Sequence, residues 1–353
     1  MSRMQEKIID KSTIAVAGID VGKSQLDVFI HPANIRLKIS NEKRAIRTLI
    51  CELTKHDVAL VTLEATGKYH VLAHEMIHDG GIDVAVVNPF RSRQFSDSMG
   101  KLAKTDTIDA EVLAHFAQRM QPEASTPMSK QVKMLRDLHS ARRQVVQEIS
   151  DLKRKLHTTD NRFIARQIKS RIAMGERHKV SLESEIHTGI SSCPELLEKF
   201  NILISIPNVG KITAATMLAD LSELGQANAK EIAALAGVAP MNWDSGAKHG
   251  KRMIRGGRQS VRNALYMCAV SSIKRNDPFG KTYRNLVKRG KNPKVALTAV
   301  MRKIVIVANT LITQRRTWKE VPPPSSPLAY FYSGRASLEL CGDSAQHGLK
   351  KIA

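Results

Sequence analysis

Residues 14–30, IAVAGIDVGKSQLDVFI, decide the fold of the N-terminal part of this chain. The segment consists of an apolar run, a tight glycine turn and a second run of alternating apolar and polar residues, which is the pattern of a β-hairpin. We expect Ile14, Val16 and Ile19 to pack inward. The segment therefore predicts the first two strands of a sheet.

The segments that follow extend this hairpin into a mixed α/β sheet. Residues 35–40, IRLKIS, predict a third strand, and residues 58–66, VALVTLEAT, have the nearly continuous apolar character of a buried central strand. Residues 82–89, IDVAVVNP, predict another buried strand that ends at the proline. Helical patterns occupy residues 42–55, 70–79 and 106–120. Three strands, followed by strands that alternate with helices, are typical of an α/β sheet of RNase H type.

From Ser129 to about Thr188 the sequence changes to long charged helices. Apolar residues recur there mostly at steps of three and four and form one stripe: Val132, Leu135, Leu138, Val145, Ile149, Leu152 and Leu156. Residues 158–161, TTDN, are expected to break the segment into a helical hairpin. The stripe indicates either a helix pair within the chain or a coiled coil between subunits. We favour the coiled coil, because no other segment nearby would cover the stripe.

Residues 200–240 contain IPNVGKITAATMLADLSEL and IAALAGVAP, which predict two short helices around a glycine turn from Pro207 to Gly210. The pattern resembles a helix-hairpin-helix, in which backbone N–H groups of the turn and of the next helix meet a DNA phosphate. A plain turn between two helices is the alternative. Lys211, directly after the glycine, favours the phosphate interpretation.

These patterns divide the 353 residues into four parts. They predict an α/β catalytic domain at 1–128, a helical coiled-coil segment at 129–192, a mainly α C-terminal domain at 193–320 and a loosely held tail at 321–353. The run VPPPSSP at the start of the tail is typical of a linker. A chain of this length has room for two or three packed domains.

Charge is the most informative feature of the composition. The sequence has 55 Lys and Arg against 33 Asp and Glu, a formal net charge of +22. Such an excess favours a polyanionic partner, because each phosphate that is neutralised releases condensed counterions. Residues 248–303 contain sixteen Lys and Arg and one acid, Asp277, whereas the first 120 residues are nearly balanced. We therefore expect the polyanion to bind the C-terminal half; a merely solvated basic surface is the alternative.

Other features of the composition exclude several classes of protein. No run approaches the roughly 18 to 20 uninterrupted apolar residues that a membrane span requires, and the first residues lack the apolar core of a signal peptide. We therefore expect a cytoplasmic protein without a membrane partner. The four cysteines form no CxxC pair and predict neither a zinc site nor a disulfide framework. Aromatic residues are only 4% of the chain, so stacking on unpaired bases is not expected to dominate recognition.

Acidic residues end two of the predicted strands. Asp20 ends the first strand, in GIDVGKS, and Glu64 ends another, in VTLEATGKYH. A carboxylate there is costly unless it is paired or binds a metal, and such strand ends are where α/β sheets bind ligands. Asp106 and Asp109, three residues apart at the start of a helix, share one face. Taken alone, this second pair has an ordinary explanation, because acids in a first turn suit the helix dipole.

The four acids together predict a metal site. Two strand-end acids and an acidic pair on a helix can converge and hold hard, oxygen-seeking cations, Mg²⁺ or Mn²⁺. Two such ions about 4 Å apart would stabilise the attacking and leaving oxygens of a phosphodiester exchange. The stretch Gly18–Ser24 is one residue short of the phosphate-cradling P-loop spacing, so we reject a Walker nucleotide site.

A series of motifs makes the chain resemble the DEDD insertion-sequence transposases, the IS-one-ten family, which is related to the Piv site-specific DNA invertases. In chain order the motifs are GIDVGKSQLDV, TLEATGKYH, NPFRSRQF, KTDTIDAEVLA, IPNVGKITAATMLADL, LAGVAP, DSGAKHGKRMIRGGRQSVRNALYMCAV and NPKVALTAVMRK. The likeness extends from about Ile14 to Arg316. Several ordered motifs make it far more specific than any one of them.

The resemblance implies a RuvC-like N-terminal domain, a coiled-coil segment and a C-terminal transposase domain that supplies a serine nucleophile. By motif position the catalytic, metal-binding acids are Asp20, Glu64, Asp106 and Asp109. The serine is Ser245, in WDSGAKHGKR, and not Ser260, in GGRQSVRNALY. Its attack on DNA would conserve the phosphodiester energy as a phosphoserine. From the residues alone, 244–246 is an ordinary flexible Asp-Ser-Gly turn.

The expected partners are nucleic acids. The resemblance implies double-stranded DNA, at the element ends and at the target, and a structured noncoding guide RNA that pairs with both DNAs in the bacterial nucleoid. We also expect a homo-oligomer, a dimer or a tetramer, so that acids of one subunit meet the serine of another. Basic residues that suit phosphate contacts are Lys211, Lys248, Lys251, Arg252, Arg255, Arg258 and Arg262.

Three other functions would use some of the same residues. In a RuvC-like Holliday-junction or structure-specific endonuclease, the same four acids would activate water and Ser245 would have no role; the long basic C-terminal region argues against a minimal nuclease. An actin-like sugar kinase would need a second glycine-rich phosphate loop, which the sequence lacks. A noncatalytic nucleic-acid scaffold would leave the four acids without a purpose.

Overall fold

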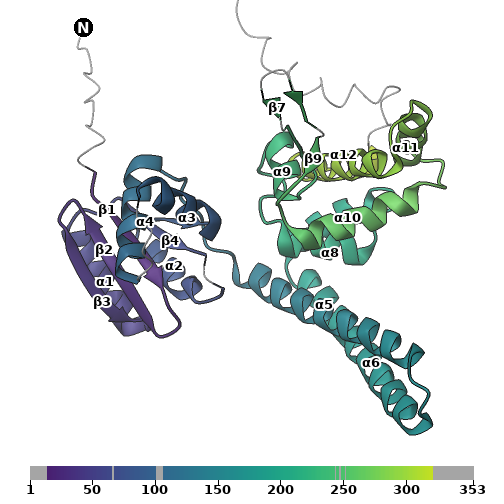
Figure 1. Ribbon diagram of the computed structural model, residues 1–353, viewed down its shortest axis with the longest axis horizontal. Coiled ribbons are helices and arrows are strands. Elements are labelled where there is room, and N and C mark those ends of the chain that lie inside the picture. Colours follow the sequence, from purple (N-terminus) through teal and green to yellow (C-terminus); the bar gives the residue numbers. More distant parts are fainter. Residues whose placement is uncertain are drawn as a thin grey trace, which may run out of the picture. The chain divides into compact units, whose positions relative to one another are not determined.

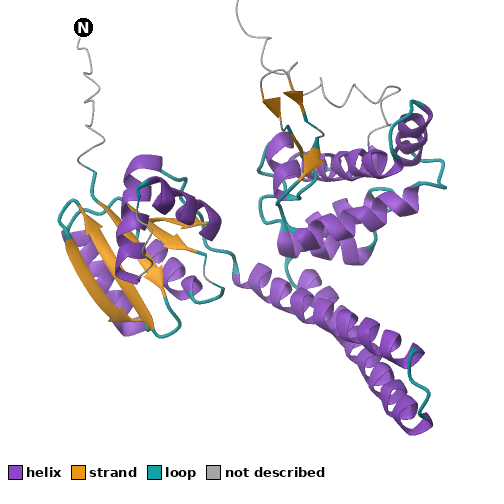
Figure 2. Ribbon diagram, viewed as in Figure 1, coloured by secondary structure: helices purple, strands orange, loops and turns teal. Residues whose placement is uncertain are grey.

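The computed structural model describes residues 14–65, 67–100, 106–242, 244–245, 248–250 and 252–320. The chain divides into two compact units, Met1–Met128 and Ser129–Ala353. The N-terminal unit is built on a β-sheet, whereas long helices make up most of the C-terminal unit (Figure 1, Figure 2).

The sheet of the N-terminal unit has five strands in the order β3-β2-β1-β4-β5. The strands are β1 (Val16–Val21), β2 (Gln25–His31), β3 (Ile35–Ser40), β4 (Leu60–Glu64) and β5 (Asp83–Val87). Strand β2 runs antiparallel to its two neighbours, β1 and β3, whereas β1, β4 and β5 run parallel. An antiparallel meander joined to parallel strands is the RNase H-like α/β arrangement that the sequence predicts.

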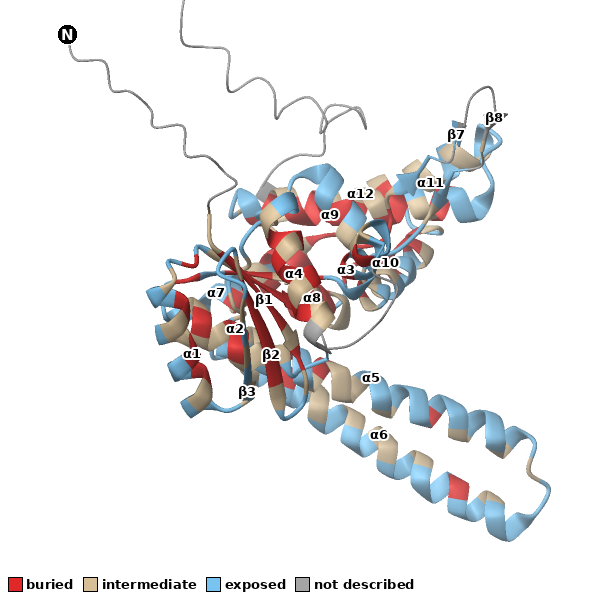
Figure 3. Ribbon diagram, turned by 60° about the vertical axis from the view of Figure 1, so that its left-hand side comes forward, coloured by how far each residue is buried: buried red, intermediate tan, exposed pale blue. Residues whose placement is uncertain are grey.

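Helices cover both faces of this sheet. On one face, α1 (Lys43–Lys55) and α2 (His70–Asp79) bury Leu49 and Ile77 against Ile19 and Leu63, because odd-numbered residues of β1 and β4 point that way. On the other face lies α4 (Asp106–Met120), which packs against β1, β2 and β4. The central strands are buried on both sides, as Figure 3 shows.

Gly18 in β1 allows α4 to lie unusually close to the sheet. A Cβ atom at this position would fall 2.1 Å from the carbonyl oxygen of Ala110 and 2.3 Å from the amide nitrogen of Ala114. Both contacts are to backbone atoms, which a change of rotamer cannot move away. The glycine therefore sets the distance between the strand that carries Asp20 and the helix that carries Asp109.

A segment after α4 covers the outer edge of β5. Ser125 donates its backbone N–H to the carbonyl oxygen of Val84 (2.7 Å), and its Oγ accepts from the backbone N–H of Val86 (3.3 Å). His74 Nε2 of α2 lies 2.7 Å from the Ser125 carbonyl oxygen. These contacts occupy two backbone groups at the outer edge of β5, the carbonyl oxygen of Val84 and the N–H of Val86.

The C-terminal unit begins with a long helical hairpin, α5 (Lys130–His157) and α6 (Arg162–Ser191). Ser129 and Asn161 cap the two N-termini by accepting backbone N–H bonds. The break expected at 158–161 is therefore confirmed. Ile149 of the apolar stripe packs within the chain against α6, where Gly175 leaves room for it. The expectation that nothing in the chain would cover the stripe was wrong, because the two helices pair with each other; a coiled coil between subunits stays a prediction.

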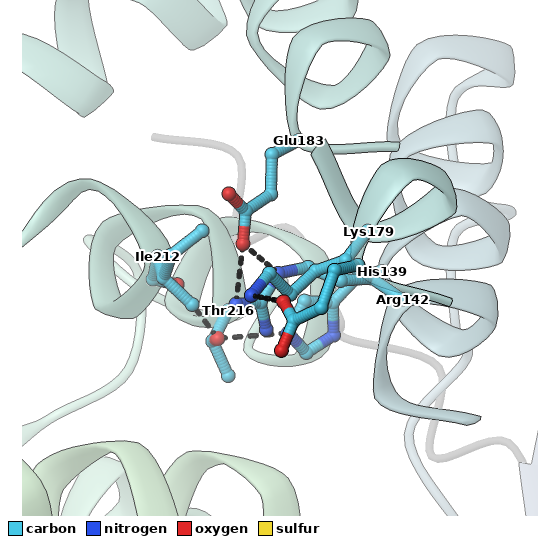
Figure 4. Close-up of polar contacts among 7 residues, drawn as sticks. His139, Arg142, Lys179, Glu183, Ile212 and Thr216 are labelled. Atoms are coloured by element: carbon cyan, nitrogen blue, oxygen red, sulfur yellow. Dashed lines mark hydrogen bonds and ion pairs between the residues drawn. The ribbon is translucent and has the colours of Figure 1, made fainter. Parts of the chain in front are cut away.

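Buried polar contacts join the base of the hairpin to helix α8 (Lys211–Asp220). His139 of α5 is 2% exposed, and its Nε2 lies 2.8 Å from Oγ1 of Thr216 in α8. Nearby, Arg142 of α5 donates through Nε to Glu183 of α6 (2.7 Å), as Figure 4 shows. Apolar residues of α5 and α6 also belong to the core of the following helices, so the hairpin base and those helices form one packed body.

The remaining helices form the core of the C-terminal unit: α7 (Pro194–Ser205), α8, α9 (Ala229–Leu235), α10 (Gln259–Ser272), α11 (Pro278–Lys288) and α12 (Pro293–Thr313). Between α9 and α10, β6 (Pro240–Met241) pairs with β9 (Met253–Ile254), and β7 (Asp244–Ser245) pairs with β8 (Lys248–His249). A short 3₁₀ helix, η1 (Trp318–Glu320), follows α12.

Among the described residues, only α12 is long and apolar enough to cross a membrane by length and composition. Val300, Ile304, Ala308 and Leu311 on this helix are completely buried in the core of the C-terminal unit. A core helix accounts for its composition.

Candidate functional site

The two strand-end acids lie side by side on the face of the sheet that α4 covers. In the parallel pair β1–β4, Ile19 stands opposite Leu63, so Asp20 and Glu64 follow at adjacent positions on the two strands. Ile19 and Leu63 point into the core under α1 and α2, and their successors therefore point to the opposite face. Both side chains are half-buried. Neighbouring strands are about 4.8 Å apart, so one ion can reach both carboxylates.

Helix α4 supplies the second pair of acids. Asp106 is its first residue, and Asp109 lies one turn further and is half-buried. The turn that contains Asp109 and Ala110 is held against β1 by the close approach at Gly18. The side chain of Asp106 lies outside the described part of the structure. All four expected acids therefore lie on elements that share one face of the sheet, and the side chains of three of them are described.

The described side chains do not by themselves complete a metal centre. Among them, no three carboxylate, imidazole or thiolate groups lie close enough together to hold a metal ion. The acids on these elements offer carboxylate oxygens, which Mg²⁺ and Mn²⁺ prefer. Two half-buried carboxylates on adjacent strands repel each other, and a divalent cation would relieve that repulsion. The residues present therefore fit a hard divalent ion.

Two residues that the sequence did not single out lie next to these acids. Ser92 of α3 (Pro89–Ser98) is 5% exposed and donates its hydroxyl to Glu64 Oε2 at 2.8 Å. Asp27 of β2 stands directly opposite Asp20 in the antiparallel pair and is 9% exposed, with Lys38 Nζ 3.9 Å from its carboxylate. NPFRSRQF already contained Ser92 and GIDVGKSQLDV already contained Asp27, but only the strand pairing and the packing of α3 place them here.

Ser245 is the last residue of β7, in the C-terminal unit. Its partner in the antiparallel pair is Lys248, and the neighbouring Asp244 accepts the backbone N–H of Gly250 through Oδ1 at 3.1 Å. The flexible turn expected at 244–246 is therefore wrong for Asp244 and Ser245, because strand pairing and this hydrogen bond order them. The side chain of Ser245 lies outside the described residues.

The rival serine, Ser260, has a structural partner. Its hydroxyl donates to Oδ2 of Asp220, and Nδ1 of His139 lies 3.5 Å from the same oxygen. Burial by itself would raise the pKa of Asp220, but the contacts with His139 and Ser260 hold it below the usual value. Ser260 thus belongs to a polar cluster, with His139 and Asp220, that ties α5, α8 and α10 together.

The expected nucleic-acid contacts divide into exposed residues and residues bound inside the fold. Lys211, Arg252 and Arg255 are exposed. Arg258 instead forms two hydrogen bonds with Glu223 (2.5 and 2.6 Å), and Arg262 donates to the carbonyl oxygen of Gly256 at 2.6 Å. The side chains of Lys248 and Lys251 lie outside the described residues.

The turn before α8 is partly tied to its surroundings. Asn208 has a left-handed backbone (φ 68°), and its Nδ2 donates to Asp277 at 2.7 Å. Gly210 and Lys211 at the start of α8 stay exposed, with open space beside the glycine. The expected short helices around a glycine turn are confirmed, whereas the binding of a phosphate there stays a prediction.

An RNase H-like sheet with acids at adjacent strand ends, followed by a strongly basic helical unit, defines an enzyme that acts on DNA. A family model described as "Transposase", of the DEDD IS110 group, matches residues 17–159, and one described as "Transposase IS116/IS110/IS902 family" matches residues 200–284. The chain belongs to this family of IS110 transposases. Family members typically use a divalent metal.

Three curated relatives agree with this membership. The pilin gene-inverting proteins of Moraxella bovis and Moraxella lacunata are each 30% identical to the chain over 318 residues, which cover 85% of the chain and 96% of the relative. The insertion element IS110 uncharacterized 43.6 kDa protein of Streptomyces coelicolor is 29% identical over 131 residues, 36% of the chain and 32% of the relative. Transposition, recombination and an insertion sequence are therefore the biological setting.

Proposed function

We propose that this protein is a metal-dependent serine transposase that cuts and rejoins DNA through a phosphoserine intermediate. The observation that carries the proposal is the adjacency of Asp20 and Glu64 on the face where Gly18 holds α4 against β1. Asp106 and Asp109 complete the set of acids. Mg²⁺ or Mn²⁺ bound there would activate the nucleophile and stabilise the charge on the reacting phosphate.

In the proposed reaction Ser245 is the nucleophile. Its Oγ forms a bond to the scissile phosphorus while the bond from that phosphorus to the leaving DNA oxygen breaks; the serine loses one proton and the leaving oxygen gains one. A hydroxyl of the second DNA strand then attacks the phosphoserine and reverses these changes. Because no water enters either step, the energy of the phosphodiester is conserved. Ser92 positions Glu64 by its hydrogen bond and does not itself react.

The proposed partners follow the charge of the C-terminal unit. Double-stranded DNA of the element ends and of the target would contact the exposed Arg252 and Arg255, with Lys211 on a further phosphate. A structured noncoding RNA would select the sites, in the bacterial nucleoid. The four parts expected from the sequence serve as catalytic domain, coiled coil, transposase domain and tail. A dimer or tetramer would form through the α5–α6 hairpin and bring the acids of one subunit to the serine of another.

The experiment is a search for a covalent protein–DNA adduct. The full chain, with its co-purified RNA, is incubated with Mg²⁺ and duplex DNA of the element ends, and products are separated under denaturing conditions. We expect an adduct in the wild type and none in Ser245→Ala or Asp20→Ala. Matched controls are Ser260→Ala and Asp79→Ala, the latter at an exposed acid at the end of α2, and both should retain the adduct.

The outcome separates this proposal from the endonuclease alternative, which the family membership does not favour. Cleaved DNA without an adduct, formed equally well by Ser245→Ala, would refute the serine and indicate attack by water. An adduct that survives in Ser245→Ala but disappears in Ser260→Ala would move the nucleophile to Ser260. Shared catalysis requires that Asp20→Ala and Ser245→Ala subunits, when mixed, restore the adduct.

A further inference from the structure

Nine of the sixteen cations in the basic block at 248–303 form two groups in the structure. One group holds the fold together. Besides Arg258 and Arg262, Arg284 donates through one nitrogen to the carbonyl oxygens of Ile273 and Arg275 at the end of α10, each at 3.0 Å. Lys303 is half-buried beside Thr282, and this burial lowers the pKa of its amino group. These four side chains already have hydrogen-bond partners within the fold.

The second group lies on α11, on the loop that follows it and at the start of α12. We call it the α11 patch, and its members are Lys281, Lys288, Arg289, Lys291 and Lys294. All five are exposed, and none makes a hydrogen bond or an ion pair with another side chain in the part of the chain that the structure describes. Residues 278–313 contain eight Lys and Arg and no Asp or Glu. No acid within this segment therefore offsets the positive charge of the patch.

The backbone under the patch is well defined. Helix α11 ends in a left-handed Gly290 (φ 77°), whose N–H donates to Val287 at 2.9 Å, while the N–H of Lys291 donates to Leu286 at 3.1 Å. Asn292 then caps α12 by accepting the N–H of Lys294 at 3.0 Å. The two helix ends thus fix the loop at residues 289–292, which carries Arg289 and Lys291, so little ordering of the backbone is required when a ligand binds.

We propose that the α11 patch is a second binding surface for the phosphate backbone of double-stranded DNA; this inference rests on the proposed function and extends it. Residues seven apart lie on one helix face, so Lys281 and Lys288 are about 10 Å apart along α11. A duplex carries one charge per about 1.7 Å of its axis, so several phosphates lie within that reach. The nearest aromatic rings, Phe279 and Tyr283, pack against the core. The patch therefore lacks a stacking platform for unpaired bases and suits a paired helix.

The α11 patch would extend the proposed DNA-binding surface at Arg252 and Arg255 along the length of α10. The start of α10 lies against Gly237 and Gly257, beside the loop that carries Arg252 and Arg255, whereas its other end receives the hydrogen bonds of Arg284 from α11. The 14 residues of α10 span about 21 Å. At about 3.4 Å per base pair, the loop with Arg252 and Arg255 and the α11 patch are about six base pairs of one duplex apart.

The test compares a triple variant of the patch with a matched control. Lys288→Gln, Arg289→Gln and Lys291→Gln are combined; the control combines Lys43→Gln, Arg44→Gln and Arg47→Gln on the exposed face of α1, which removes the same charge. Binding of the full chain to a 30-base-pair DNA duplex of arbitrary sequence is measured over a range of salt concentrations. A 30-base-pair RNA duplex is the second arm.

We expect the patch variant to bind about 10- to 100-fold more weakly, with a slope of log Kd against log salt that is smaller by about 2 to 3, since each lost phosphate contact removes about 0.9. Hydroxyl-radical footprinting on an element-end duplex should lose about six base pairs of protection at one edge. Loss of binding to DNA, alone or together with RNA, supports the proposal, whereas loss of binding to the RNA duplex alone would overturn it.

Equal slopes and affinities for the patch variant and the control would overturn this inference. If the wild type forms the covalent adduct and the patch variant matches the control, the inference fails and the proposed function stands. If the wild type forms no adduct, the proposed function fails, and the salt slope of duplex binding still tests whether the patch contacts phosphates. Circular dichroism checks that the variants fold, which is expected because the replaced side chains have no internal partners.

Discussion

Replacing Gly18 by alanine would test whether the contact between β1 and α4 assembles the acids. The new Cβ would lie 2.1 Å from the Ala110 carbonyl oxygen, and ordinary contact begins at 3.4 Å, so the helix must move by about 1.3 Å. Overpacking of this kind destabilises a core by about 1 to 3 kcal/mol. At roughly 4 °C per kcal/mol for a domain of this size, we expect the N-terminal unit to unfold about 4 to 12 °C lower.

The more specific effect concerns chemistry. A displacement of about 1 Å in a catalytic group can reduce a rate by about 10²-fold, and here the displaced helix carries Asp106 and Asp109. At a temperature where circular dichroism shows the variant folded, single-turnover adduct formation should fall by about that factor. Gly189→Ala in α6 is the matched control, because its Cβ would meet only the Met134 side chain at 3.8 Å. A Gly18→Ala protein with unchanged melting temperature and adduct rate would refute the reasoning.

Three further predictions concern neighbouring groups. Ser92→Ala removes the hydrogen bond to Glu64 and should raise the Mg²⁺ concentration needed for half-maximal adduct formation by about 10-fold; an unchanged Mg²⁺ titration would contradict the positioning role. Arg258→Gln should lower the melting temperature of the C-terminal unit and leave the salt slope of DNA binding unchanged, because Arg258 is bound to Glu223. Arg255→Gln should leave the melting temperature unchanged and reduce the salt slope. Equal effects of the two variants in both measurements would contradict this assignment. The pKa of Asp220 is depressed in the folded protein, so this carboxylate stabilises the fold above its unfolded pKa of about 3.9, and the stabilisation disappears as pH falls through the folded pKa. Urea unfolding from pH 6 to 3 should therefore show a smaller loss of unfolding free energy in Asp220→Asn than in the wild type. Parallel curves of unfolding free energy against pH for the two proteins would exclude this role.

Much of the N-terminal sheet could be predicted from the sequence because its signals are local. The strand at 35–40 and the helices at 70–79 and 106–120 have the expected bounds, since the apolar period differs between strand and helix. Asp20 and Glu64 stood out because a charge at the end of an apolar strand is rare. Helix α3 was missed, as its residues form no clear apolar stripe, although Asn88 and Pro89 are ordinary start signals.

The roles of the basic residues could not be predicted, because their partners are distant in the chain. Arg258 meets a carboxylate 35 positions away, and Ser260 meets one 40 positions away. Nothing in the local pattern distinguishes Arg258 from the exposed Arg255. The neighbours of Asp20 and Glu64 depend in the same way on strand register and on the packing of α3.

The segment around Ser125 matters for how copies of the chain behave when they are crowded. A bare edge strand is a template for strand addition and aggregation. In this sheet one edge, β5, is occupied by the Ser125 contacts, and the other, β3, carries the charged residues Arg36 and Lys38. Where copies of the chain reach high local concentrations, covered or charged sheet edges keep neighbouring copies from pairing through their strands.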